Sequence, residues 1–261
     1  MTPADIQRIK DLLPTTLGSE EIREQIAADI LRRSVFSARM ASATYLARVR
    51  EVCAQVSEGS INLATARAQL LETLSRMGHS PLDGGGLSNP ASIRRLNLIV
   101  ETQRQMAASV AKLNEETPAT LEQWPAWRLT RMEGRGAPRP DWAKRWQAAG
   151  DACGWEGAVP NSGIYPDWDM VALKSSPIWQ ELGNGAGGFR DTLGNPFPPF
   201  AFGSGLDWED VDADECRAIG LLGDGQTVEA PEAASLSPGE RDIAEAISRL
   251  GGDFAGIAEG L

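Results

Sequence analysis

All eight tryptophans of this 261-residue chain fall between Trp124 and Trp208, and this stretch constrains the fold more than any other. It contains two conspicuous phrases, a basic one from Trp127 to Trp142 and a proline- and phenylalanine-rich one from Asn195 to Gly205. Glycine and proline are frequent between them, so helices and strands are expected to be short there. Large aromatic side chains must then supply the burial that regular packing does not. We therefore expect a small α+β core with Trp/Pro-rich loops.

Local patterns predict where the regular elements of this core lie. Apolar and polar residues alternate from Trp127 to Met132, which predicts a strand. Asp141 is placed to begin a helix that runs to about Ala149, and a short helix is expected from Ala213 to Ile219. Long ordered loops with brief strands are expected over residues 150–205. The glycine run from Gly183 to Gly188 lacks the strand and spacing of a dinucleotide-binding fingerprint, so we interpret it as a flexible loop.

The residues before this core are expected to form long N-terminal helices. From Ser19 to Val56 there is no proline or glycine, and apolar residues recur mostly three to five positions apart, which predicts one long helix. Asn62 is a candidate cap for a second helix, and the Asn89-Pro90 pair is a candidate start for a third. Three antiparallel helices joined by short turns are the simplest arrangement for a helical arm over residues 1–115.

Negative charge is concentrated at the C-terminal end of the chain. The net charge is −11, and residues 200–261 hold 3 Lys or Arg against 14 Asp or Glu. Residues 223–237 have a linker-like composition, and residues 238–250 predict a last amphipathic helix. The expected organisation is a helical arm (1–115), an α+β core (116–222), and an acidic linker with a C-terminal helix (223–261). The positive and negative charges of residues 1–199 balance, and this disfavours a sequence-independent nucleic-acid binder.

Neither a membrane protein nor a disulfide-rich secreted protein is indicated. No apolar run approaches the roughly 18 to 20 residues that cross a bilayer, and the N-terminus lacks the features of a signal peptide. The cysteines Cys53, Cys153 and Cys216 are odd in number and widely spaced, so no disulfide framework or zinc site is indicated. We expect a cytosolic protein with reduced cysteines.

The sequence does not contain a recognisable catalytic set. Its one histidine, His79, lies in a Gly-Pro turn and is expected at the surface. The carboxylates from Asp207 to Glu215 are dense enough to bind a hard cation, but the run lacks the glycine and closing glutamate of an EF-hand loop. A solvated acidic face is the main interpretation, and a surface for a basic partner is the alternative. We predict no catalytic residue, no metal and no cofactor.

Two further sets of residues are candidates for interaction rather than catalysis. Arginines on the expected first helix could contact DNA phosphates, although acidic residues on that helix make a salt-bridged solvent face the main interpretation; the candidates are Arg32, Arg39 and Arg50. Aromatic and proline residues in or next to the two conspicuous phrases are expected to hold the core together and to form its interaction candidates, and these are Trp127, Trp142, Trp146, Pro199, Phe200, Phe202 and Trp208.

Three stretches together resemble a known family over about residues 90–222. They are the helix from Arg94 to Ala108, the strand and turn from Trp127 to Gly150, and the phrase from Asn195 to Gly205 with the Asp207-Trp208 that follows it. They are similar to the Mu-type phage head morphogenesis, or minor head, family. In two places the chain departs from the family: Trp142 stands where the family commonly has histidine, and the closing Asn-Cys-Arg-Cys phrase is absent. The resemblance therefore transfers no metal or catalytic role to this chain.

The resemblance implies a low-copy structural protein of a tailed-phage or prophage head. Such a minor capsid protein acts near the portal in capsid assembly, DNA packaging or DNA delivery. Its partners are the portal or other head proteins, and it is found in the virion and, during assembly, in the host cytoplasm. One alternative is an ADP-ribosyltransferase-like enzyme, for which Arg128, Arg131 and Glu133 are the nearest local hint. The other is a non-phage adaptor that binds a basic partner through its acidic C-terminal segment.

Overall fold

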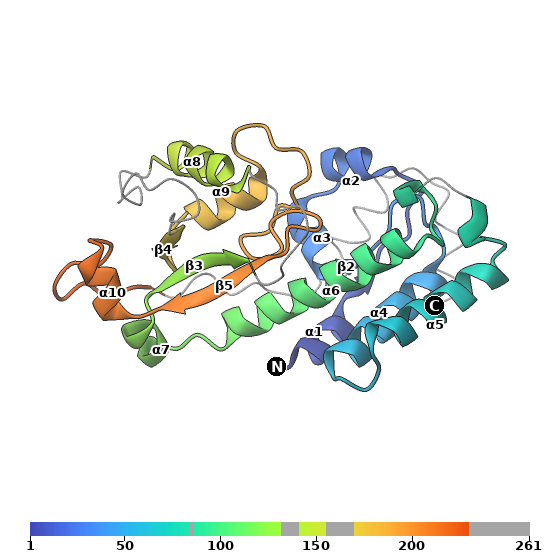
Figure 1. Cartoon of the computed structure of the whole chain (residues 1–261), viewed down its shortest axis with the longest axis horizontal. Helices are drawn as coiled ribbons and strands as arrows, with labels where there is room; N and C mark the ends of the chain where they lie inside the picture. The colour runs from blue at the N-terminus through green and yellow to red at the C-terminus, as the bar shows by residue number, and fades with distance from the viewer. Residues whose placement is uncertain (84–85, 132–140, 155–169, 230–261) are drawn as a thin grey trace. The chain divides into compact units, whose positions relative to one another are not determined.

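The computed structural model describes residues 1–83, 86–131, 141–154 and 170–229, and these form a mixed α+β protein (Figure 1). The expected fold class is thereby confirmed, while the helix expected over residues 238–250 lies outside the described residues. Contacts between Cα atoms divide the chain into unit 1, which contains Met1–Ala111, and unit 2, which contains the described residues from Lys112 onward. No helix in the described ranges is both long and apolar enough to cross a membrane.

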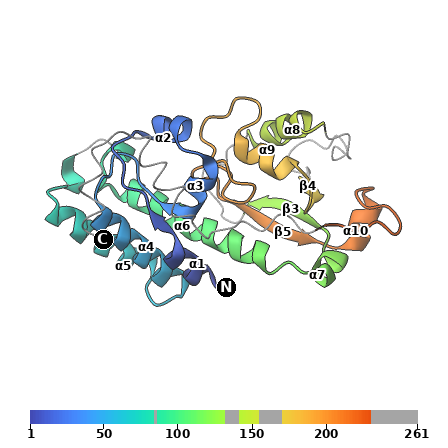
Figure 2. The ribbon, with the colours of Figure 1, turned by 180° about the vertical axis from the view of Figure 1, so that it is seen from behind.

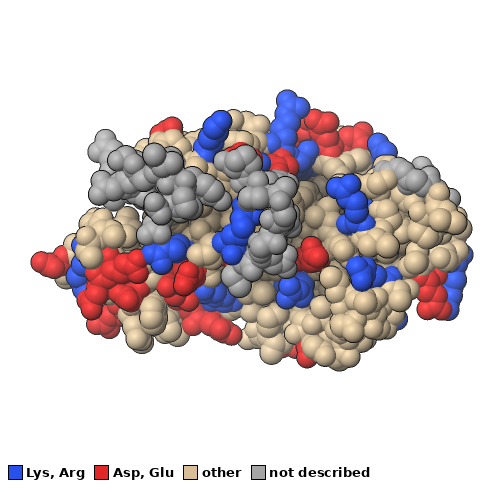
Figure 3. Space-filling view, in the orientation of Figure 1, with Lys and Arg blue, Asp and Glu red and all other residues tan. Residues whose placement is uncertain are grey.

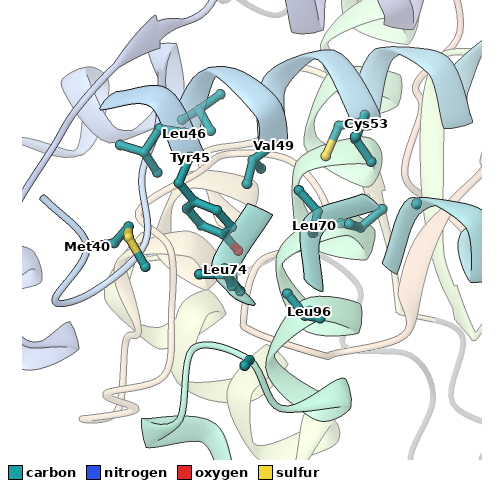
Figure 4. Close-up of a cluster of buried hydrophobic side chains, with 13 residues drawn as sticks. Met40, Tyr45, Leu46, Val49, Cys53, Leu70, Leu74 and Leu96 are labelled. Carbon is teal, nitrogen blue, oxygen red and sulfur yellow. The ribbon is translucent and has the colours of Figure 1, made fainter. Parts of the chain in front are cut away.

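Unit 1 is mainly helical. Its elements are α1 (Pro3–Ile9), β1 (Asp11–Leu12), α2 (Ser19–Gln25), α3 (Ala28–Arg33), β2 (Ser34–Val35), α4 (Ala43–Ser57), α5 (Leu63–Arg76), the 3₁₀ helices η1 (Pro81–Asp83) and η2 (Gly86–Ser88), and most of α6 (Ile93–Asn114). Helix α4 lies between α1 and α5 in both views of the ribbon (Figures 1 and 2). Helices α4, α5 and α6 contribute to one buried core, in which Tyr45, Leu70, Leu74 and Leu96 meet (Figure 4). Burial of these apolar side chains stabilises the helical unit.

The single long helix expected from Ser19 to Val56 is wrong. Backbone dihedrals leave the helical region at Ile26 and again at Ser34, and β2 pairs in parallel with β1. Arg39 has a positive φ of 56°, which a helix does not accommodate. The break has a physical cause, because pairing with a distant strand and the buried side chains of this stretch outweigh local helix propensity. The absence of proline and glycine permitted a helix here but did not require one.

One of the two predicted helix caps is confirmed and the other is wrong. Asn62 Oδ1 accepts a hydrogen bond of 2.9 Å from the backbone N–H of Thr65 at the start of α5. Asn89 Oδ1 instead accepts from Ala91 N in a turn, and α6 begins only at Ile93. The hydroxyl of Ser92 then takes the capping position, because it accepts the backbone N–H of Arg95 at 3.3 Å.

Unit 2 is a three-stranded antiparallel sheet with helices on its faces. Its elements after the end of α6 are α7 (Pro118–Gln123), β3 (Ala126–Arg131), α8 (Trp142–Ala152), β4 (Val171–Leu173), α9 (Ile178–Asn184), β5 (Leu206–Val211) and α10 (Ala213–Ala218). The strand order is β4-β3-β5, so β3 is central. Helices α8 and α9 lie together on one side of the sheet, and α10 follows β5 at its end (Figure 1).

The predicted elements of unit 2 are confirmed at β3, α8 and α10, whereas α7, α9 and β5 were not predicted. The expectation of a flexible loop at Gly183–Gly188 is also wrong at its start, because Gly183 and Asn184 form the last turn of α9. Gly185 ends this helix in the left-handed conformation with φ 80°, which glycine adopts without strain. A Cβ on Gly183 would lie 1.9 Å from the carbonyl oxygen of Asn195, so this position requires glycine for close packing.

Candidate functional site

The register of the sheet in unit 2 brings one set of side chains to a common face. Trp127 of β3 lies opposite Ala172 of β4 and Asp210 of β5, and Leu129 lies opposite Trp208. Successive side chains of a strand point to opposite faces, so Trp127, Trp208 and Asp210 share one face of the sheet. The same alternation places Ala126 and Val211 on the other face, in a small core with Cys216 of α10.

Five aromatic rings fill the first of these faces and are here called the aromatic cluster: Trp127, Trp146, Trp179, Phe200 and Trp208. The indoles of Trp127 and Trp208 stack with centroids 3.8 Å apart and planes 7° apart. Trp179 of α9 meets three other indoles edge-on, at centroid distances of 5.4 to 5.9 Å. Phe200 lies 6.1 Å from Trp179 and 6.2 Å from Trp208. The rings therefore pack chiefly against one another, each pair adding about 0.5–1.5 kcal/mol beyond area burial.

Charged side chains converge at the edge of the aromatic cluster and are here called the ion network: Lys112, Glu116, Lys174 and Asp210. Asp210 is its centre, with Oδ1 at 2.9 Å from Lys174 Nζ and Oδ2 at 3.0 Å from Lys112 Nζ. Lys174 Nζ also lies 2.6 Å from Glu116 Oε1. The indole N–H of Trp127 donates to Asp210 Oδ1 at 3.0 Å, and Lys174 Nζ lies 5.2 Å from the Trp127 ring centroid.

The ion network is buried at Lys174 and Glu116 and partly exposed at Lys112 and Asp210. The side chains of Lys174 and Glu116 are 2% and 6% exposed, while those of Lys112 and Asp210 are 31% and 36% exposed. Burial alone would raise the pKa of Asp210, but hydrogen bonds from Lys174 and Lys112, with their positive charges, outweigh it and hold the pKa below its ordinary value. Asp210 is therefore a carboxylate at neutral pH. Its partners can orient and stabilise it, but Lys174 and Glu116 are hidden from a dissolved substrate.

A second ionic arrangement in unit 2 surrounds Arg145 of α8. Its guanidinium carbon lies 4.9 Å from the Trp142 ring centroid and 4.1 Å from that of Phe189. The guanidinium also pairs with Asp141 Oδ2 and with Asp191 Oδ1, at 2.8 Å in each case. The two aromatic rings lie against the planar guanidinium, and the two carboxylates pair with the nitrogens at its edge. This arrangement fixes α8 to the loop after α9.

The phrase from Asn195 to Gly205 is an ordered part of the core. Phe200 is fully buried, and its carbonyl accepts the backbone N–H of Leu193 at 3.1 Å. The peptide between Pro198 and Pro199 is cis. The backbone N–H of Phe202 donates to Asp191 O at 3.1 Å. This loop thus presents Phe200 to the aromatic cluster and closes one side of it.

The structure brings together only part of the residue set selected from the sequence. Trp127, Trp146, Phe200 and Trp208 meet in the aromatic cluster, whereas the ring of Trp142 lies against Arg145. Pro199 is buried beside Phe200, and Phe202 is half-buried. Among the described residues, the sequence did not single out Trp179, Arg145 or the ion-network residues Lys112, Glu116 and Lys174, and it gave Asp210 only as part of the acidic run. One signal for the network was present in the sequence. Lys174 follows the short apolar run Val171–Leu173, and strand alternation places it on the same side as Ala172, which lies opposite Trp127.

The acidic run from Asp207 to Glu215 is more structural than expected. Asp212 Oδ1 accepts the backbone N–H of Glu215 at 2.8 Å and so caps α10. Glu215 pairs with Arg128 of β3, and Asp214 pairs with Arg217 at 2.8 Å. Over the described ranges, no group of three or more His, Cys, Asp or Glu side chains is placed to hold a metal ion. Glu209 and Asp214 are exposed, as expected for a solvated acidic face, whereas Asp210, Asp212 and Glu215 also make contacts within unit 2.

The arginines that suggested contact with DNA or with a dinucleotide are not arranged as expected. Arg32 lies in α3, Arg39 in the turn before α4, and Arg50 in α4, so they do not form a stripe along one helix. One Arg50 guanidinium nitrogen donates to Lys10 O at 2.8 Å. Arg128 is engaged by Glu215, and Glu133 lies outside the described residues. Contact with DNA and dinucleotide handling stay predictions.

An open groove of about 450 Å³ lies between α4 and α5 in unit 1. Apart from Ala47, the residues that line it are polar or charged, and they comprise Thr44, Ala47, Arg48, Glu51, Gln69, Glu72, Thr73 and Arg76. The charged groups already have partners within the unit: Arg48 donates to Gln69 at 3.1 Å, and Arg76 pairs with Glu72. These pairs make it a solvated helix–helix groove without the apolar walls that bury a small ligand.

Comparisons with protein-family models, with curated proteins and with solved structures return no match. The resemblance to phage minor head proteins therefore rests on the residues quoted for it, and the function must be argued from the geometry of unit 2.

Proposed function

We propose that this protein is a structural minor head protein of a tailed phage or prophage, acting near the portal in capsid assembly, DNA packaging or DNA delivery. The resemblance over residues 90–222 supplies the role. The single structural observation that supports it is the closed core of unit 2, in which rings from two of the three family-like stretches pack around Trp179. A structural component of a capsid needs a well-packed core to keep its fold during assembly, and the aromatic cluster gives unit 2 such a core.

The ion network favours a structural role over a catalytic one. A catalytic site needs ionisable groups that a substrate can reach, in a concave pocket. Lys174 and Glu116 lie 2.6 Å apart but are 2% and 6% exposed, and Asp210 is held as a carboxylate by two lysines. Removing one partner of such a set leaves a buried charge without compensation, which is strongly destabilising. The network is therefore suited to fixing the residues at the end of α6 onto the sheet.

The surface of unit 2 offers an acidic region for partner contact. Asp and Glu side chains gather over α10 and the neighbouring end of β5 (Figure 3). Glu209 is exposed there, and the Asp214 side chain is 97% exposed. Complementary charge accelerates encounter and selects partners, so a basic surface on the portal or another head protein fits this region.

The direct test is genetic and biochemical. In a phage or prophage that encodes this protein, it should co-sediment with purified heads at low copy. Deleting the gene should lower infectivity or leave heads defective in packaging or delivery. Particles that lack the protein but keep normal composition, DNA content and infectivity would refute the proposal.

A matched pair of variants tests the acidic region. The double substitution Glu209→Lys and Asp214→Lys should weaken binding of the full chain to purified portal, because it reverses the charge of the contact. The control is Glu20→Lys with Glu24→Lys on the exposed side of α2, which changes the net charge equally. Equal loss in both variants, or no loss in either, would exclude a specific contact through this region.

A further inference from the structure

The first helix of unit 1 is docked through a polar side chain that lacks partners. Helix α1 packs on α4, and both ribbon views show the two helices side by side (Figures 1 and 2). Gln7 lies fully buried in α1, and neither its Oε1 nor its Nε2 has a hydrogen-bond partner among the described residues. An unpaired buried amide costs free energy, because water would satisfy both atoms once the helix is released. Gln7 therefore opposes the docking of α1.

Lys10 directly follows α1 and carries a buried ammonium group. The residue is 1% exposed, and its Nζ donates to Gln103 Oε1 of α6 at 2.9 Å. Because Gln103 is neutral, this bond satisfies one donor of the ammonium but supplies no negative charge. Within the described ranges no carboxylate pairs with the ammonium, and this includes the adjacent Asp11. A buried charge without a counter-charge is strongly unfavourable, so Lys10 also opposes docking.

The titratable groups around Lys10 do not neutralise it. Cys53 of α4 could do so only as a thiolate, but burial raises the pKa of its thiol to about 12 and keeps it neutral at pH 7. Arg50 of α4 donates to the Lys10 carbonyl oxygen at 2.8 Å, and Arg104 of α6 acts on Cys53 as a positive charge. Both arginines add positive charge to the region. Burial lowers the pKa of Lys10 to about 8.

The ion pairs that join α1 to α4 lie at the surface. Arg8 pairs with Glu58 at 2.5 Å and with Glu51 at 3.6 Å, and these three side chains are 38% to 42% exposed. Exposed ion pairs contribute little, because water screens them. Ile6 is buried and favours docking, but α1 has only 7 residues and is too short to be stable as an isolated helix. Helix α1 thus depends on a contact that two of its own buried groups oppose.

We propose that residues 1–10 form an N-terminal latch, which opens at neutral pH while the rest of unit 1 stays folded. Opening hydrates Gln7 and Lys10 and uncovers the sides of α4 and α6 that they cover. In the open latch the ammonium has its ordinary pKa of about 10.4, so protonation favours opening by on the order of 100-fold at pH 7. This effect is complete below about pH 8 and fades as the pH rises toward about 10.4. The latch does not depend on the phage role proposed above.

Hydrogen exchange of the full chain at pH 7, followed by mass spectrometry, tests the latch. The amides of residues 6–9 should exchange through an opening that leaves the amides of residues 46–56 in α4 protected. Lys10→Met removes the buried charge and should raise the protection of residues 6–9 by about tenfold or more, without lowering that of α4. Gln7→Leu should act in the same direction, because it removes the unpaired amide. Equal protection of α1 and α4 in the native protein, or a loss of α1 protection in Lys10→Met, would overturn the proposal.

Two control variants separate the latch from simple fraying of a chain end. Lys144→Met removes an exposed lysine of α8 in unit 2 and should leave the exchange of α1 unchanged. Arg8→Met removes the exposed ion pairs with α4 and should lower the protection of α1 by less than about fivefold. Fraying alone would give the same α1 protection in the native protein, in Gln7→Leu and in Lys10→Met. That result would also refute the latch, because its opening is attributed to the two buried polar groups.

Discussion

Replacing Asp210 by asparagine removes the charge at the centre of the ion network while preserving the shape of the side chain. Lys174 then keeps only Glu116 as an ionic partner, and its side chain is 2% exposed, so water cannot replace the lost carboxylate. The amide of asparagine keeps one oxygen as an acceptor, but its NH2 group presents a donor to one of the two lysines. We expect Asp210→Asn to destabilise unit 2 without changing its fold.

The magnitude follows from the exposure of each pair. Lys112 and Asp210 are 31% and 36% exposed, so solvent screening leaves their pair worth only about 0.5 kcal/mol. The bond from Lys174 is buried on the lysine side, and a hydrogen bond between charged groups contributes about 1.5–3 kcal/mol. The expected loss is therefore about 2 kcal/mol, or a fall in Tm of about 8 °C for a unit of this size.

Urea unfolding followed by tryptophan fluorescence measures this loss. The control is Glu209→Gln, the exposed neighbour on β5, which should change the free energy of unfolding by less than about 0.5 kcal/mol. The pKa of Asp210 is below its ordinary value, so its stabilisation is present above about pH 4 and is lost as the pH falls further. The difference between the native protein and Asp210→Asn should thus shrink below that pH. A loss equal to that of the control would refute a stabilising ion network.

Three further substitutions, one of them with a control, test separate parts of the structure by urea unfolding, followed by tryptophan fluorescence for unit 2 and by far-ultraviolet circular dichroism for Lys10 in unit 1. Trp208→Ala should cost about 3 kcal/mol or more, because it empties one side of the stack, and a change near zero would mean that the ring faces solvent. Gly183→Ala should lower the free energy of unfolding by about 3 kcal/mol, because the added Cβ would clash with Asn195 O. The control Gly220→Ala has open space around the added Cβ but a φ of +76°, and it should cost about 1 kcal/mol. Equal losses in the two variants would contradict close packing at Gly183. Burial lowers the pKa of Lys10 to about 8, so its charge destabilises the folded state at pH 7 and this penalty fades as the pH rises toward about 10.4. Lys10→Met should therefore raise the free energy of unfolding at pH 7 by about 2 kcal/mol and give a smaller gain at pH 10; destabilisation at pH 7 would contradict this reasoning.

Elements with a strong local signal could be predicted from the sequence. Alternation identified β3, and the Asn62 cap was recognisable because a cap is a local hydrogen bond. The burial of Trp127 and Trp208 followed from the scarcity of regular structure around them, since large rings must provide the core in such a stretch.

Features that depend on distant contacts could not be predicted in this way. The break between α3 and α4 depends on β2 pairing with β1, more than twenty residues earlier in the chain. The ion network depends on the register that sets Asp210 opposite Trp127 and brings Lys174 beside both. Each of these residues has an ordinary local context, and only the assembled sheet turns them into one cluster.

The proposed role is tested most directly by a cryo-electron microscopy map of heads purified from a phage or prophage whose genome encodes this chain. We expect density for unit 2 beside the portal, with Trp127, Trp179 and Trp208 still packed on one another and no ligand between them. A particle map without this chain, or a nucleotide seated against those rings, would contradict it.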